Sequence, residues 1–222
     1  MRFFALIFCL ILAGNAIAQA PGYIGKRTIV ELGVTGAPSI LYGIEEGLWG
    51  PDLECIIGAE RVMSRRISLS VSAWAMSSRA RYANPQLEGG FARVSALGLN
   101  GSIRFYHYRR SGVPAPVGPY HELGLGALQY RLRDLDGIYN PQGERRFGPY
   151  ADGRIFYRLG TRSVIKDRFC WNIALELGTL FSLPQTNFRA QVGPRDLGRA
   201  RLIRHSAIGL HIGFGVLLDK KP

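Results

Sequence analysis

The sequence predicts an all-β fold: an eight-stranded antiparallel transmembrane β-barrel with up-and-down meander topology. About eight segments of roughly ten residues alternate between bulky apolar side chains and small or polar ones, which is the period of a β-strand. These segments are longer than the five or six residues that are usual for strands of soluble sheets. The connections between them alternate between long and short, a pattern typical of outer-membrane barrels with extracellular loops and periplasmic turns.

Each predicted strand presents a bulky apolar side chain at every second position, and we expect these side chains to face the membrane. In chain order they are Val30, Leu32 and Val34 in strand 27–36; Leu53, Cys55 and Ile57 in strand 52–63; Ile67, Leu69 and Val71 in strand 67–78; Leu97, Leu99, Ile103 and Phe105 in strand 91–108; Leu123 and Leu125 in strand 120–132; Ile155, Tyr157 and Leu159 in strand 152–165; Trp171, Ile173, Leu175, Leu177 and Phe181 in strand 169–181; and Ile208, Leu210, Ile212, Phe214, Val216 and Leu218 in strand 208–218. Gly101 interrupts the apolar face of the fourth strand and predicts a β-bulge there.

The connections follow from the breaks between these strands. They are long at 37–50, 79–90, 133–150 and 182–199, short at 64–66 and 166–168, and intermediate and rich in proline at 109–119.

The opposite faces of the strands carry charged residues, which predicts a charge cluster in the lumen of the barrel. Its members are Glu31, Glu54, Glu60, Arg104, Glu122, Arg154, Arg158, Arg162, Glu176 and His211. This placement avoids roughly 2–4 kcal/mol for each arginine that would otherwise meet the middle of the bilayer. Because eight strands enclose a space that side chains fill, we expect the charges to pair and to close the lumen. A gated path for ions or small solutes is the alternative.

The first 18 residues read as a secretory signal peptide. Arg2 precedes the apolar run Phe3–Ala13, and Ala16-Ile17-Ala18 forms a small-x-small cleavage site. The run is too short to span a bilayer as a helix. We therefore expect residues 19–222 to form a single barrel domain in the bacterial outer membrane.

The charge of the chain is strongly basic, with a formal net charge of +12. Loss of Arg2 with the signal peptide would leave 12 − 1 = +11. Of the 28 basic residues only four are lysine, and arginine is the better partner for bidentate contacts with carboxylates and phosphates. This predicts either ion pairs in the lumen or a surface that holds lipopolysaccharide phosphates, whereas the export signal argues against nucleic acid.

The cysteines of the mature chain, Cys55 and Cys170, could pair in an oxidising compartment. We assign both to the outward apolar phase of their strands and expect two free thiols. No cysteine or histidine spacing predicts a metal site, and we expect no cofactor.

The pattern over residues 23–218 resembles the small outer-membrane β-barrels of Gram-negative bacteria, whose barrel domain is OmpA-like. The segment Pro21–Lys26 also looks like the mature start of exported barrels of this kind, and the sequence has no counterpart of the peptidoglycan-binding domain. The resemblance implies a monomer in contact with outer-membrane lipids, lipopolysaccharide and the outer-membrane assembly machinery. The sequence departs from the family at Val216-Leu217-Leu218, where such barrels end on an aromatic residue that this machinery reads.

Some barrels of this kind modify lipid A, which directs attention to the four histidines, His107, His121, His205 and His211. A hydrolase needs a nucleophile within reach of a base, but adjacent strand residues such as His205 and Ser206 point to opposite faces. We predict that His211 is a lumen neighbour of Glu176, as a packing contact.

The expected function is therefore non-enzymatic: envelope structure, surface recognition or minor solute passage. The alternatives are a lipid A-modifying acyl hydrolase barrel and a soluble periplasmic barrel that binds an apolar ligand.

Overall fold

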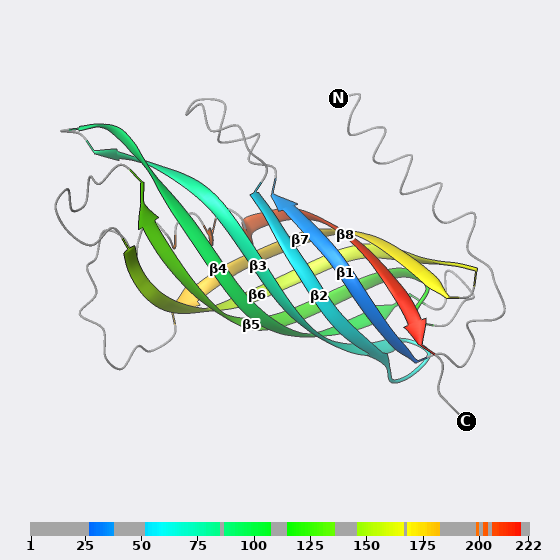
Figure 1. The fold of residues 1–222 in the computed structure, drawn as a ribbon. Coiled ribbons are helices and arrows are strands. Elements are labelled where there is room, and N and C mark those ends of the chain that lie inside the picture. The colour runs from blue at the N-terminus through cyan, green and yellow to red at the C-terminus, as the bar shows by residue number, and fades with distance from the viewer. Residues whose placement is uncertain are drawn as a thin grey trace.

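The computed structural model describes residues 27–37, 52–84, 87–107, 115–135, 146–166, 168–182, 199, 202–203 and 206–218. Within them eight strands close into one barrel in which every strand pairs with its neighbours in the chain, and the last pairs with the first (Figure 1). All pairings are antiparallel, so the predicted eight-stranded meander is confirmed. The strands are β1 (Thr28–Ala37), β2 (Asp52–Val62), β3 (Ile67–Asn84), β4 (Leu87–Tyr106), β5 (Gly118–Asp134), β6 (Arg146–Ile165), β7 (Phe169–Ser182) and β8 (Ile208–Leu218).

The predicted signal peptide lies outside the described residues. None of the helical residues that the structure describes belongs to a helix long and apolar enough to cross a membrane.

The strands on one side of the barrel are longer than the sequence pattern predicts. The predicted loop 79–90 is mostly strand, because β3 continues to Asn84 and β4 begins at Leu87. β6 begins at Arg146, where the sequence predicts a loop that lasts to residue 150. Polar side chains gave these segments the composition of loops, but the hydrogen bonds of a hairpin join backbone groups and continue regardless of side-chain polarity. β3 and β4 consequently project beyond the ends of β1 and β2 (Figure 1).

The backbone register is regular at Gly101, so the bulge predicted there is wrong. Gly101 stands opposite Val71 and Leu125 within continuous ladders. Gly101 lies on the outer face with no atom within 4 Å of where a Cβ would be, so the missing side chain leaves a gap on the surface without changing the pairing.

A register shift occurs instead in the β5–β6 ladder, between Tyr130 and Leu132. The β6 segment opposite this shift contains Gly148 at φ 103°, a conformation that glycine adopts at low steric cost. Beyond the shift Arg146 stands opposite Arg133.

The two faces of the wall have opposite polarity. Large apolar side chains are exposed on the outer face of every strand, as the alternation predicts. Examples from four strands are Leu32 (61% exposed), Val71 (65%), Leu99 (68%) and Phe214 (65%). Charged and polar side chains are buried inside.

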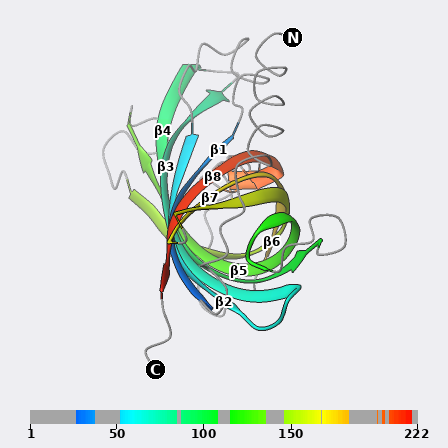
Figure 2. The same ribbon diagram turned by 90° about the vertical axis from the view of Figure 1, so that its right-hand side faces the viewer.

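Apolar clusters close the interior at both ends. The cluster toward the long connections includes Trp74, Leu128, Tyr130 and Leu180, together with Leu202 from the segment before β8. Two smaller clusters lie toward the short connections, the end from which Figure 2 views the barrel. They are Ile29, Val117, Val164, Cys170 and Leu217, and Val62, Tyr106, Ala115, Tyr120 and Ala174.

Candidate functional site

A network of charged residues lies between these apolar ends. Along β5 the buried side chains include Tyr120, Glu122 and Leu128, in this order. The carboxylate of Glu122 therefore has apolar side chains on both sides. The ten residues predicted to line the lumen are all buried: Glu31, Glu54, Glu60, Arg104, Glu122, Arg154, Arg158, Arg162, Glu176 and His211. They comprise five carboxylates and four guanidinium groups, so the formal charge of the network is −1 when His211 is neutral.

β6 supplies three of the four arginines, Arg154, Arg158 and Arg162. A spacing of four residues keeps them all on the inner face of the strand. Arg154 Nη1 donates to both carboxylate oxygens of Glu54 at 3.0 Å, and its Nη2 donates to Glu176. Arg154 therefore joins β6 to two other strands.

Arg158 and Arg104 continue the network through shared carboxylates. Arg158 Nε donates to Glu176 at 2.5 Å, and Arg158 Nη1 lies 3.5 Å from Glu122. Arg104 Nε donates to the same Glu122 at 2.8 Å, while Arg104 Nη1 donates to Glu60 at 2.5 Å.

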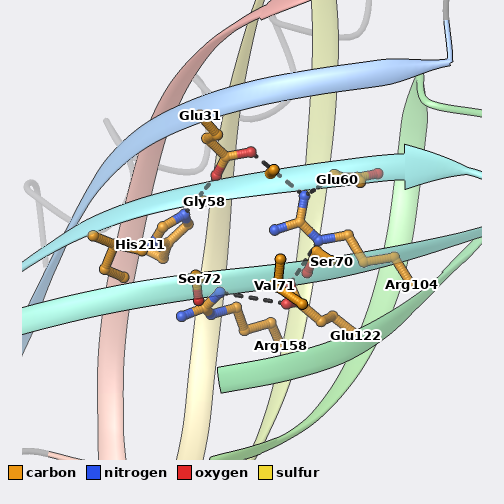
Figure 3. A pocket seen from close by; sticks show the side chains of 12 residues that line it. Glu31, Gly58, Glu60, Ser70, Val71, Ser72, Arg104, Glu122, Arg158 and His211 are labelled. Carbon is orange, nitrogen blue, oxygen red and sulfur yellow. Dashed lines mark hydrogen bonds and ion pairs between the residues drawn. The ribbon is translucent and has the colours of Figure 1, made fainter. Parts of the chain in front are cut away.

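Arg162 completes the network at the carboxylates of Glu60 and Glu31. Its Nη1 donates to Glu60 at 2.6 Å and its Nη2 donates to Glu31. Arg104 Nη1 also lies 3.5 Å from Glu31, and Figure 3 shows Arg104 directed toward this pair of glutamates. Each arginine of the network thus meets at least two carboxylates, the arrangement that offsets the high cost of burying charge.

Neutral side chains donate further hydrogen bonds to three glutamates of the network. The sequence analysis did not single out these neutral donors. Each comes from an inward position of its strand, which is the signal that could have found them. They are Ser68 and Tyr106 on Glu60 (2.6 and 2.9 Å), Ser102 on Glu122 (2.5 Å) and Asn172 on Glu31 (2.8 Å).

His211 binds other partners than the one predicted. Its ring nitrogens lie 3.0 Å from Thr35 Oγ1 and 3.2 Å from a Glu31 oxygen. Glu176 also points inward on the paired strand β7, but among the described residues no hydrogen bond or ion pair joins it to His211, and its carboxylate bonds to Arg154 and Arg158.

A small cavity lies beside the network, with Glu31, Arg104, Arg158 and His211 among its lining residues (Figure 3). Its volume is about 20 Å³, which is room for about one water molecule. The charged middle of the barrel is therefore filled by side chains. Among the described residues, no three histidine, cysteine or acidic side chains are grouped so as to hold a metal ion.

Of the other histidines considered for catalysis, His107 and His121 lie apart from the network. His121 is on the outer face, where Nδ1 contacts the Tyr157 hydroxyl and the ring packs 4.5 Å from that of His107. His205 lies outside the described residues. Ser206 is buried in a helical segment before β8, so the strand conformation predicted for this residue is wrong.

Both described cysteines are free thiols, as predicted. Cys55 is exposed on the outer face, but Cys170 is buried, and its assignment to the outward phase is wrong. Cys170 belongs to the even-numbered positions of β7, which include the buried Asn172 and Ala174.

The fold and the network define a closed eight-stranded antiparallel barrel with an ion-paired interior and an apolar exterior. Among solved structures, the chain is similar to the N-terminal β-barrel domain of OprF from Pseudomonas aeruginosa. The sequences are 9% identical, and the match covers 87% of this chain and 98% of that chain with a TM-score of 0.43. No protein-family model and no curated protein matches the sequence.

Proposed function

We propose that the chain is a non-enzymatic outer-membrane β-barrel that anchors its long connections at the cell surface and has a closed, charge-paired interior. The observation that carries this proposal is the inverted polarity of the wall. Arg162 and Glu122 are each 1% exposed, whereas Leu99 is 68% exposed. In water such a surface would be a large aggregation-prone patch, while in a bilayer it meets a matching solvent.

The apolar surface has the dimensions of a membrane-spanning band. On β4 the outer face is free of charged and polar side chains from Leu97 to Phe105, where Leu97, Leu99, Ile103 and Phe105 face outward. This stretch matches the roughly 9–11 residues that a tilted strand needs to cross the hydrocarbon core. On the same face Ser95 and Arg93 follow toward the long connections.

The interior favours a structural anchor over solute passage and over storage of an apolar ligand. The ionic network joins β1, β2, β4, β5, β6 and β7 through side chains, and apolar clusters lie at both ends. An apolar ligand would have to displace these paired charges, which is costly. Outer-membrane lipids, lipopolysaccharide and the assembly machinery are then the expected partners of a monomer.

The test compares two arginine substitutions on the same face of β4. Leu99→Arg places a charge in the middle of the apolar band, and Ser95→Arg, its control, places one near the band's edge. For a membrane barrel we expect Leu99→Arg to lower the free energy of unfolding by about 2–4 kcal/mol and Ser95→Arg by about 0–1 kcal/mol. Unfolding is followed in lipid vesicles by the gel shift between unheated and boiled protein.

The location is tested in parallel by membrane fractionation. Recovery of the protein in the outer-membrane fraction, with a heat-dependent gel shift, supports the proposal. Recovery from the soluble periplasm, with Leu99→Arg as stable as the wild type, would contradict it and favour the soluble barrel.

A further inference from the structure

Four exposed arginines stand together on the outer face near the long connections: Arg93 on β4, Arg131 and Arg133 on β5, and Arg146 on β6. We call them the arginine row. Arg133 is its centre, because it stands directly opposite Arg93 in the β4–β5 ladder and directly opposite Arg146 in the β5–β6 ladder. Adjacent strands are about 4.8 Å apart, so the three side chains start roughly 10 Å from end to end. The backbone register extends the series to Arg79 on β3, which stands opposite Arg93.

This arrangement costs free energy in the protein alone. Like charges directly opposite each other across two strands are destabilising. None of the four arginines of the row forms an ion pair with a described residue, in contrast to the buried arginines, each of which meets at least two carboxylates.

Among the acidic side chains that the structure describes, those nearest to the row in the sequence face the other way. Asp134 directly follows Arg133 but is 1% exposed, and Asp152 is fully buried at 0%. The described carboxylates at this end of the barrel thus lie inside, where Asp152 pairs with Arg199, whereas the arginines of the row lie outside. The row therefore lacks a counter-charge from the described part of the chain.

The row also sits at a defined height on the barrel wall. On β5 the outward sequence runs from Leu123 and Leu125 through Gln129 to Arg131 and Arg133. The arginines therefore begin where the apolar band ends. In a membrane this is the level of the lipid headgroups, where phosphate groups lie.

We propose that the arginine row binds the phosphate groups of a lipid headgroup that carries more than one phosphate, such as the lipid A part of lipopolysaccharide. This inference rests on the proposed membrane location and assigns a binding site to one of the proposed lipid partners. Guanidinium groups bind phosphate oxygens in bidentate pairs. Three of them span about 10 Å and Arg131 adds a fourth, so the row provides more positive charge than one phosphodiester neutralises. A bound bisphosphate would replace the repulsion within the row by attraction.

The test uses Arg93→Gln/Arg133→Gln, with Arg61→Gln as the matched control. Arg61 is an exposed arginine at the other end of the barrel, and its cross-strand neighbours are Thr28 and Leu69. Each purified protein is first shown to be folded in nonionic detergent by its heat-dependent gel shift. A protein without this shift would count against the membrane barrel itself, so that failure is distinct from failure of the lipid site.

Binding is then measured by native mass spectrometry with three probes: lipopolysaccharide, the same lipopolysaccharide after removal of its phosphates, and inorganic phosphate. We expect the double variant to bind lipopolysaccharide at least tenfold more weakly than the wild type, and Arg61→Gln to bind it normally. Dephosphorylated lipopolysaccharide should bind all three proteins as weakly as intact lipopolysaccharide binds the double variant. Equal binding of both lipopolysaccharides by the wild type would overturn the proposal, and so would saturation of the site by inorganic phosphate alone.

Thermal stability gives a second readout that a purely structural role would not produce. Without lipid, the double variant should melt at a higher temperature than the wild type, because the repulsion within the row is relieved. With lipopolysaccharide the order should reverse. A variant that is less stable than the wild type under both conditions would overturn the proposal, since the arginines would then stabilise the barrel without lipid.

Discussion

Arg154 on β6 and Glu54 on β2 form a buried ion pair across the barrel, although 100 residues separate them in the chain. The two strands are four places apart in the closed ring of eight, so they belong to opposite walls. The guanidinium group also bonds to Glu176 and lies 5.0 Å from the centre of the Trp74 ring. One side chain therefore ties two walls of the barrel together.

Arg154→Met should be strongly destabilising, because it removes the guanidinium group that Glu54 and Glu176 share. Both carboxylates are at most 1% exposed and would lose this charge partner in the buried interior. Removal of one partner from a buried ion pair costs roughly 3–5 kcal/mol. We expect a loss of this size in the free energy of unfolding, measured by urea titration in detergent micelles.

Two further variants identify the cause of that loss. Arg61→Met, at an exposed site, should change stability by no more than about 0.5 kcal/mol. The double variant Glu54→Gln/Arg154→Met should lose less free energy of unfolding than Glu54→Gln and Arg154→Met lose together as single variants, because the carboxylate charge of Glu54 is gone. Strict additivity of the two losses would show that the pair does not act as a unit.

Two glycines on β4 should respond in opposite ways to the same substitution. Gly98 is on the inner face, and a Cβ there would collide with the indole of Trp74, whereas Gly101 is on the outer face with open space. Gly98→Val should cost about 1–3 kcal/mol by overpacking. Gly101→Val should be neutral or stabilising, because valine favours strands and adds apolar surface toward lipid. The melting temperatures of both variants in the same micelles decide this, and equal losses would contradict the assignment of the faces.

The alternation of side chains was enough to predict the eight strands and the face on which most side chains lie. A period of two leaves only two choices for each strand, so Leu99 outside also places Asn100 and Arg104 inside. The same rule places Cys170 inside with Asn172. The assignment of Cys170 to the outer face was wrong because it put this residue in the opposite phase of the alternation. Strand ends were less predictable, because the polar segment that continues β3 and β4 is held by backbone pairing.

The partners within the network could not be predicted from the sequence. They depend on the tilt of the strands, which sets the height at which each side chain enters the interior. In the β7–β8 ladder His211 is level with Ala174, and Glu176 is level with Gly209. His211 accordingly reaches Glu31 on β1, the strand on its other side.

The two cysteines that the structure describes should differ in their reaction with thiol reagents. Cys55 is exposed on the outer face, and Cys170 is buried among Ile29, Val164 and Leu217. In folded protein in vesicles we expect an apolar maleimide to label Cys55 and a charged, membrane-impermeant one to leave it unlabelled. Cys170 should react only after boiling. Cys55→Ser should abolish labelling of the folded protein, and residual labelling would place Cys170 at an accessible surface.

The wild-type barrel should conduct no ions in planar bilayers. The ionic network fills the middle of the barrel and leaves a cavity of about 20 Å³, and apolar clusters lie on both sides of it. An ion would have to displace paired charges and then cross an apolar layer, and both steps are costly. A water-filled porin in the same bilayer is the positive control.

The substitution Arg158→Ala enlarges the cavity but leaves both apolar ends in place, so this variant should conduct no ions either. Unitary current steps from the wild type that Glu122→Gln or Arg158→Ala alters in size would contradict a closed interior and would mean that the network rearranges to open a path.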